Sequence, residues 1–184
     1  MRAIFIGSFN PPTKAHLDIA LKLQEDYEKI IFVPVNSTTK YLAPFINRVE
    51  MLSIYTNRYK SFVISKIMQD YSYFNFRILD LLKSIYGNID IIIGYDLLEN
   101  LYKFDNYEYL LENFYFVVVP RYNKDVKTLI KEKYFNYQNK FRILDYFSNI
   151  NSTDARNLIK ECKNPKDLLD SEVINYINNH HLYF

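Results

Sequence analysis

The chain has 184 residues, of which 49% are hydrophobic and 24% are charged, and its formal net charge is +2. This length suits one domain with its own core, so we expect a single domain over residues 1–184. No long basic run supports a nucleic-acid partner, and no apolar run reaches membrane-spanning length. With one cysteine and no signal-peptide pattern, we expect a cytoplasmic protein. The sequence leaves the oligomeric state open.

Apolar runs alternate with segments of helical period along the chain. The apolar runs predict strands at 2–7, 29–35, 62–65, 89–94, 113–120 and 141–144. The helical spacing predicts helices at 15–28, 48–59, 74–86, 97–101, 153–162 and 167–178. Continuous apolar strands separated by helices are typical of a parallel sheet with helices on both faces. We therefore predict an α/β fold that binds ligands at the carboxyl ends of its strands.

Two of the three glycines, Gly7 and Gly94, stand at predicted strand ends. A glycine there lets the backbone turn sharply and lets a ligand approach closely. Glycines also end strands where no ligand binds. Two such positions in a chain so poor in glycine favour a binding site.

The stretch "GSFNPPTKAH" (7–16) joins the first predicted strand to the first predicted helix. It is neither a dinucleotide-binding G-x-G-x-x-G motif nor a P-loop. A helix start still offers backbone N–H groups and a positive dipole end, which suit a phosphate chain. Thr13 can cap this helix, and His16 would lie in its first turn on the ligand side. The alternative is a first-turn histidine with no ligand.

This stretch resembles the nucleotidylyltransferase motif G-x-F-x-P-x-[HT]-x-x-H, with Thr13 and His16 at its last two defined positions. A second motif of that superfamily, I-S-[ST]-x-x-[RK], resembles "INSTDAR" (150–156), with Asn151 for the first serine and Arg156 as the terminal base. Two motifs in the expected order make a chance match far less probable than one. The resemblance implies a Rossmann-like open parallel sheet of the nucleotidylyltransferase type.

The middle of the chain resembles the nicotinamide/nicotinate mononucleotide adenylyltransferases. "VPVNSTTKYLAPFINRVEML" (33–52) is similar to their V-P-x…K…R-x-x-M segment, and "IIIGYDLLENLYKF" (91–104) to their G-x-D-x-L…W segment, with Phe104 for the tryptophan. The resemblance implies transfer of AMP from ATP to a pyridine mononucleotide, with release of pyrophosphate. Such a reaction needs cations and hydrogen-bond donors that hold two polyanions in line and stabilise the leaving pyrophosphate.

The resemblance also implies a role for each matched residue. His16 and Arg156 would be catalytic, acting on the phosphates of ATP. Mg²⁺ would bridge those phosphates through water, without a metal site on the protein. The implied ATP-binding residues are Ser8, Phe9, Thr13, His16, Gly94, Asp96, Ser152, Thr153 and Arg156, and the implied mononucleotide-binding residues are Ser8, Phe9, Lys40 and Phe104.

Other interpretations stay open for several of these residues. Asp96 could cap the helix expected at Leu97, and Ser152 and Thr153 could cap the late helix. Lys40 could be a solvated loop lysine, and Phe104 a core residue. Ala15 stands where the family usually has glycine and adds a methyl group close to the ligand loop. Phe74 stands where the family usually has threonine, in a region that helps to recognise the pyridine, so nicotinate and nicotinamide both remain candidate acceptors. A different acceptor, such as phosphopantetheine, and a non-catalytic nucleotide sensor are the competing functions.

Overall fold

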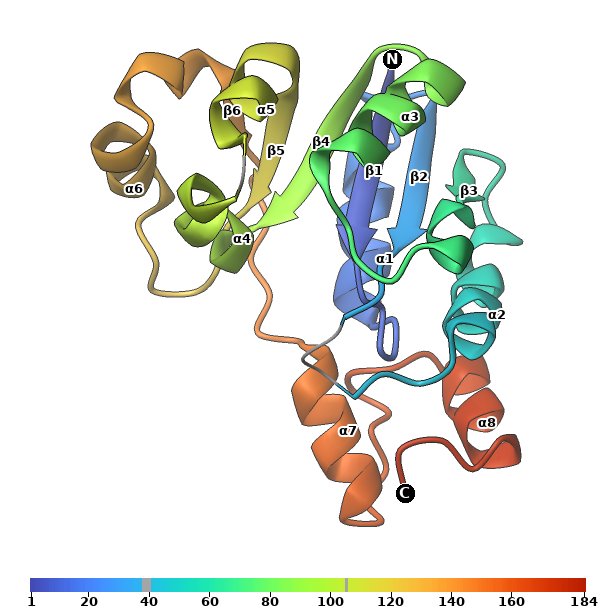
Figure 1. Cartoon of the computed structure of the whole chain (residues 1–184). Coiled ribbons are helices and arrows are strands. Elements are labelled where there is room, and N and C mark those ends of the chain that lie inside the picture. The colour runs from blue at the N-terminus through green and yellow to red at the C-terminus, as the bar shows by residue number, and fades with distance from the viewer. Residues whose placement is uncertain (38–40, 105) are drawn as a thin grey trace. The chain divides into compact units, whose positions relative to one another are not determined.

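A computed structural model of the chain describes residues 1–37, 41–104 and 106–184. Its six strands form one sheet in the order β3-β2-β1-β4-β5-β6 (Figure 1). The pairs β1–β4, β2–β3, β4–β5 and β5–β6 are parallel. This sheet confirms the predicted Rossmann-like open parallel α/β fold. No helix in the described ranges is long and apolar enough to cross a membrane.

The elements follow one another in strand–helix alternation. The strands are β1 (Arg2–Gly7), β2 (Lys29–Pro34), β3 (Phe62–Ile64), β4 (Ile89–Gly94), β5 (Tyr115–Val119) and β6 (Phe141–Ile143). The α-helices are α1 (Lys14–Leu23), α2 (Phe45–Thr56), α3 (Phe76–Tyr86), α4 (Tyr95–Asn100), α5 (Tyr107–Asn113), α6 (Val126–Lys133), α7 (Ser152–Lys160) and α8 (Ser171–Asn179). Three short 3₁₀ helices span Ile67–Asp70, Leu101–Lys103 and Phe135–Lys140.

All six predicted strands are present within one or two residues of their expected ends. The predicted helices are less accurate, because α1 ends at Leu23 instead of residue 28 and α2 begins at Phe45 instead of Arg48. Pro44 immediately precedes α2, and a proline is compatible with a helix start because its missing N–H is not needed there. The chain leaves α1 early, and Tyr27 is then buried beyond the helix end.

Contacts between Cα atoms divide the chain into two compact units, each built from two segments. One comprises Met1–Ile6 and Asn75–Asn149, and the other comprises Gly7–Phe74 and Ile150–Phe184. The prediction of a single domain over residues 1–184 therefore stays a prediction. In the first unit, β4 has five consecutive buried residues, as expected for a strand covered on both faces.

The second unit has a hydrophobic cluster to which α2, α7 and α8 each contribute one face. Apolar residues recur at helical spacing along α7 (Ala155, Ile159) and along α8 (Val173, Ile177). These faces, together with Tyr183 beyond α8, form the cluster, which also contains Ala43, Met51, Tyr55 and Leu169. Burial of Ala155 fixes the orientation of α7 about its axis and so fixes where its neighbour Arg156 can reach.

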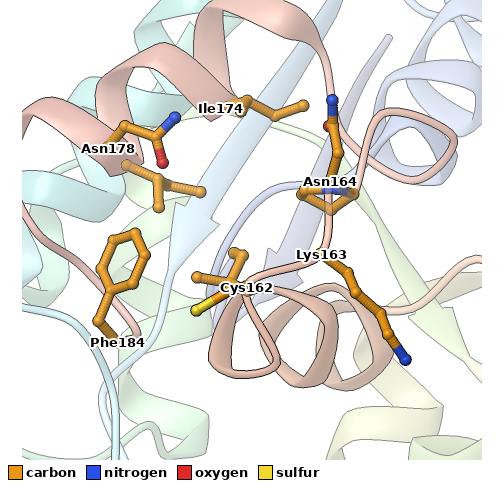
Figure 2. Close-up of a pocket in the computed structure, with 9 residues that line it drawn as sticks. Cys162, Lys163, Asn164, Ile174, Asn178 and Phe184 are labelled. Carbon is orange, nitrogen blue, oxygen red and sulfur yellow. The ribbon is translucent and has the colours of Figure 1, made fainter.

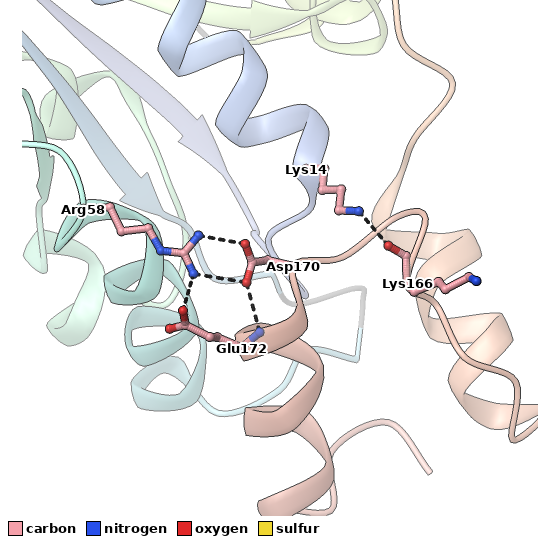
Figure 3. Close-up of polar contacts among 5 residues, drawn as sticks. All are labelled: Lys14, Arg58, Lys166, Asp170 and Glu172. Carbon is pink, nitrogen blue, oxygen red and sulfur yellow. Dashed lines mark hydrogen bonds and ion pairs between the residues drawn. The ribbon is translucent and has the colours of Figure 1, made fainter.

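Polar contacts fix the start of α8 in the same unit (Figure 3). The side chain of Asp170 caps α8 by accepting a hydrogen bond from the Glu172 backbone N–H. The guanidinium of Arg58, which follows α2, lies 2.7 Å from Asp170 and 2.6 Å from Glu172. The hydrogen bond from Arg58 lowers the pKa of Asp170. Lys14 at the start of α1 donates to the carbonyl of Lys166 in the segment leading to α8.

Candidate active site in the second unit

The loop after β1 turns around an aromatic ring. Phe9 is only 1% exposed, has a φ of 46°, and packs edge-on against Phe32 and His16. A Cβ atom added at Gly7 would lie 3.0 Å from the Phe9 ring. The ring of Phe9 is therefore the group that lies close to Gly7 in this structure and leaves no room for a side chain there. Because that ring is buried, Phe9 can reach a ligand only through its backbone.

Thr13 is the N-cap of α1, as predicted, and it holds His16 in the first turn. The Nδ1 atom of His16 lies 2.9 Å from the backbone nitrogen of Thr13 and 2.8 Å from its Oγ1 atom. The Thr13 side chain is fully buried. Its contribution to a phosphate site is therefore to position His16.

The contact with Thr13 also sets the tautomer of His16. A backbone N–H can only donate, so Nδ1 is the acceptor and Nε2 carries the proton of the neutral ring. Burial lowers the pKa of His16 to about 4, which keeps the ring neutral near pH 7. His16 is thus prepared as a neutral Nε2–H donor, which suits a phosphate oxygen without adding a positive charge.

The start of α7 lies against the loop that follows β1. Asn151 is the N-cap, with its side chain accepting from the Asp154 backbone N–H across 2.9 Å. The alternative that Ser152 or Thr153 caps this helix is therefore wrong. The Ser152 hydroxyl instead donates to the carbonyl oxygen of Pro11 across 2.8 Å. The two sequence motifs are thereby joined through the backbone of the first.

Arg156 makes a second connection between the motifs. Its Nη1 atom lies 2.6 Å from the carbonyl oxygen of Asn10, and its Nη2 atom lies 3.2 Å from the Thr153 hydroxyl. These acceptors are neutral, and no carboxylate of the described residues forms an ion pair with Arg156. The guanidinium is therefore oriented by the protein while its positive charge is not neutralised.

A cavity of about 600 Å³ opens beside these residues. Its polar lining includes Arg156 and Lys160, which lie one helical turn apart on α7, and no aspartate or glutamate among the described residues lines it. A cavity of this size with two cationic side chains and no acidic side chain from the described part of the chain suits a polyanion. Its lining residues are Ser8, Asn10, Tyr41, Leu42, Ala43, Ser152, Thr153, Arg156, Lys160, His181, Leu182, Tyr183 and Phe184.

Arg48 on α2 supports one wall of this cavity from inside the unit. The residue is 1% exposed, and its guanidinium donates to the carbonyl oxygens of Ser8, Val35 and Ala43 at 2.8–3.0 Å. It also donates to the Asn36 side chain across 2.7 Å. Burial lowers the pKa of Arg48. One buried side chain therefore ties together the segments after β1, after β2 and before α2.

A smaller cavity of about 320 Å³ lies between α7 and α8 (Figure 2). It is lined by Cys162, Lys163, Ile174 and Asn178, among others, and by none of the predicted site residues that lie within the described ranges. Phe184 lines both cavities. Phe184 is therefore a common wall of the larger cavity and of this more apolar one.

Gly94, Asp96 and Phe104 belong to the first unit. Gly94 is the N-cap of α4, which begins at Tyr95, so the alternative that Asp96 caps this helix is wrong. The Asp96 carboxylate instead forms an ion pair with Arg121, which follows β5. A Cβ at Gly94 would meet nothing within 4 Å, and Phe104 is 41% exposed and so is not a core residue.

Hydrogen bonds in the second unit join Arg156 to Thr153 and join both Arg156 and Ser152 to the loop after β1. The Ser8 carbonyl of that loop accepts from Arg48, whereas Thr13 and His16 contact each other and do not line the larger cavity. Lys40, predicted for the mononucleotide phosphate, lies outside the described residues. Ala15 is buried in α1, so the methyl group that replaces the usual glycine is accommodated in the helix. The ligand contacts implied for all of these residues remain predictions.

Comparison with known proteins identifies the family. The cytidylyltransferase-like family model matches residues 4–158. A probable nicotinate-nucleotide adenylyltransferase of Endomicrobium trichonymphae is 33% identical, with 98% of this chain and 97% of the relative covered. The chain belongs to the nicotinate-nucleotide adenylyltransferase family. A second relative with that name, from Acholeplasma laidlawii, is 28% identical over 100% of this chain and 97% of its own.

A solved structure supports the fold of this family. The nicotinic acid mononucleotide adenylyltransferase of Plasmodium falciparum, complexed with NaAD, has a TM-score of 0.81 and 21% identity. The match covers 99% of this chain and 96% of the other. At this identity the likeness establishes the shared fold.

The sequence analysis assigned no role to Asn10, Arg48 and Tyr183, which make contacts in the second unit, or to Arg121, which pairs with Asp96 in the first. Arg48 was detectable, because it shares the buried face of α2 with Leu52 and Tyr55 at helical spacing. Arg121 was also detectable, since it follows β5 and the adjacent strand β4 precedes Asp96. Asn10 and Tyr183 had no such signal, because they are 173 residues apart.

Proposed function

We propose that this chain transfers AMP from ATP to nicotinate mononucleotide, forming the nicotinate dinucleotide and pyrophosphate. An oxygen of the mononucleotide phosphate attacks the α-phosphorus of ATP, and the bond from that phosphorus to the oxygen bridging the β-phosphate breaks. The pyrophosphate leaves with the electrons of that bond. The names of two relatives, both probable nicotinate-nucleotide adenylyltransferases, support this acceptor.

The observation that carries this proposal is the joining of the two motifs. Arg156 and Ser152 of the late motif bind the backbone carbonyls of Asn10 and Pro11 in the early motif. This arrangement places an oriented cation beside a cavity that no described aspartate or glutamate side chain lines. Charge builds on the leaving pyrophosphate during the transfer, and a fixed cation stabilises it without reorganising.

His16 and Arg156 have complementary roles in this proposal. His16 donates its Nε2–H to a phosphate oxygen of ATP, while Arg156 clamps the phosphates that leave. No general base is needed, because the attacking phosphate is already anionic near neutral pH. Gly94 and Asp96 contact the ribose of ATP, and Lys40 binds the mononucleotide phosphate.

Mg²⁺ would be held by the substrate more than by the protein. The described residues contain no group of three or more His, Cys, Asp or Glu side chains placed to hold a metal ion. The polyanion cavity fits a magnesium complex whose ligands are phosphate oxygens and water. When bound, the ion neutralises phosphate charge.

We also propose that the protein acts in the cytoplasm as a single domain. A lone cysteine, Cys162, suits a reducing compartment. One cooperative thermal transition, seen by both circular dichroism and calorimetry, would support the single domain.

The direct experiment supplies ATP, Mg²⁺ and one acceptor at a time. Nicotinate mononucleotide, nicotinamide mononucleotide and phosphopantetheine are compared at equal concentration, and the adenylylated product and pyrophosphate are quantified. We expect the highest kcat/KM with nicotinate mononucleotide. Faster turnover of phosphopantetheine would make the chain a transferase for another acceptor. Nucleotide binding without turnover of any acceptor would make it a sensor.

A further inference from the structure

We propose that Tyr183 is a positioning residue for Arg156 and acts through Asn10. This inference rests on the proposed function, because it assigns the origin of the Arg156 orientation in that same site. The three residues come from the early loop, from α7 and from the segment after α8. They are joined by two hydrogen bonds that cross most of the length of the chain.

The first bond connects Tyr183 to the side chain of Asn10. The hydroxyl of Tyr183 lies 2.8 Å from Asn10 Oδ1, and both residues are buried. Burial raises the pKa of Tyr183, so its hydroxyl keeps the proton that it donates. The ring packs in the hydrophobic cluster with Ala43 and Ala155, which holds the hydroxyl at this place although the backbone φ of Tyr183 is 71°.

Asn10 passes this constraint to Arg156. Its Oδ1 atom accepts from two donors, the Tyr183 hydroxyl and the Ala43 backbone N–H at 2.9 Å. Two donors on one oxygen fix which way the amide faces, and its nitrogen then donates to the carbonyl of Tyr41. With its side chain fixed in this way, Asn10 presents its backbone carbonyl to Nη1 of Arg156 at 2.6 Å.

Loss of the Tyr183 hydroxyl should affect the transition state of the reaction more than the protein without substrate. Without the Tyr183 hydroxyl, Asn10 keeps one of its two donors, and the Asn10 peptide gains freedom to rotate. Arg156 would still attract phosphate by its charge, but its planar donors would be less well aligned with the leaving pyrophosphate. Loss of alignment lowers kcat more than it raises the KM for ATP.

The test compares two buried tyrosines of the same hydrophobic cluster. Tyr183→Phe removes the hydroxyl that contacts Asn10 and keeps the ring. Tyr55→Phe is the matched control, because the Tyr55 hydroxyl is buried and has no hydrogen-bond partner within the described residues. We expect Tyr183→Phe to lower kcat by about fivefold to tenfold, the size expected for one lost hydrogen bond. Tyr55→Phe should stay within about twofold of the wild type.

A double-mutant cycle separates positioning from a general packing effect. In an Arg156→Ala background, Tyr183→Phe should change kcat by less than about twofold, because the residue through which it acts is gone. An equal loss in both backgrounds would overturn the proposal. So would a Tyr183→Phe enzyme with the kcat of the wild type.

A binding measurement distinguishes failure of the positioning role of Tyr183 from failure of the proposed function. Calorimetry with inorganic pyrophosphate needs no turnover and reports the same Arg156 contact. We expect Tyr183→Phe to weaken pyrophosphate binding about threefold to tenfold with Arg156 present, and not in the Arg156→Ala background. If the chain lacks transferase activity but shows this coupling, the positioning role stands and the proposed function falls. If pyrophosphate binding is equal with and without the hydroxyl, the positioning role falls.

Discussion

The Nδ1 atom of His16 accepts a hydrogen bond from the backbone N–H of Thr13, with 2.9 Å between the nitrogens. This contact decides which ring nitrogen donates, because the neutral ring then carries its proton on Nε2. The protein itself therefore orients the histidine of the early motif as an Nε2–H donor. The orientation of His16 comes from the N-cap residue of α1, Thr13.

The first prediction concerns the position of that donor. In His16→Gln the side-chain NH₂ group can reach the place of Nε2, whereas in His16→Asn the shorter amide stays near the place of Nδ1. We expect His16→Gln to retain at least about tenfold more kcat than His16→Asn or His16→Ala. Steady-state kinetics with ATP and nicotinate mononucleotide measure this, with ATP affinity followed by calorimetry. Equal activity of the Gln and Asn variants would exclude Nε2 as the donor.

The second prediction follows from the pKa of His16, which burial lowers from 6.5 to about 4. Between these values the unfolded chain binds more protons at this site than the folded chain, so the free energy of unfolding falls as the pH drops. We expect Tm to decrease from pH 7 to pH 4.5 less steeply in His16→Gln than in the wild type. Parallel Tm curves for both proteins would contradict a lowered pKa of His16 in the folded protein.

The third prediction concerns the shape of the Arg156 side chain. Arg156→Lys keeps a positive charge and loses the planar fork that binds the Asn10 carbonyl and the Thr153 hydroxyl. We expect kcat to fall on the order of 100-fold, the size typical of removing one transition-state donor. Lys163→Gln is the control, since Lys163 forms an ion pair with Glu161 and does not line the larger cavity. Near-normal turnover of Arg156→Lys would refute a role for the fork.

The fourth prediction contrasts two glycines that follow strands. An added methyl at Gly7 would press on the Phe9 ring at 3.0 Å, while one at Gly94 would meet nothing within 4 Å. Gly7→Ala should therefore lower Tm, and Gly94→Ala should leave Tm unchanged. If ATP packs against Gly94, Gly94→Ala raises the KM for ATP by roughly tenfold. A Gly94→Ala enzyme with an unchanged KM would remove Gly94 from the ATP site.

The fifth prediction concerns the buried guanidinium of Arg48. Arg48→Met replaces it with an apolar chain and leaves the carbonyls of Ser8, Val35 and Ala43 without this donor. We expect a loss of about 3 kcal/mol in the free energy of unfolding, measured by urea denaturation. A loss below about 1 kcal/mol would show that water or other groups satisfy these carbonyls.

The strands were predictable because a continuous apolar run such as "IDIII" is typical of a parallel strand that is buried on both faces of the sheet. Helix ends were less predictable, because caps depend on single residues. Asn151 caps α7 although Ser152 and Thr153 follow it directly and are good cap residues themselves.

The residues of the candidate site could be predicted where they belong to a motif. They could not be predicted where only tertiary contacts bring them together. His16 and Arg156 stand at motif positions, and the contacts of Arg156 and Ser152 with the early loop agree with a shared site. The bond between Asn10 and Tyr183 depends on packing across 173 positions of sequence, for which no local pattern exists.

The most direct test of AMP transfer follows the phosphorus atoms of ATP. The protein is incubated with Mg²⁺, nicotinate mononucleotide and ATP labelled on either the α- or the γ-phosphate, and the products are separated. Transfer of AMP predicts that the α-label appears in the dinucleotide and the γ-label in pyrophosphate, at equal rates. An α-label that stays in ATP or AMP, with no labelled dinucleotide, would contradict this function.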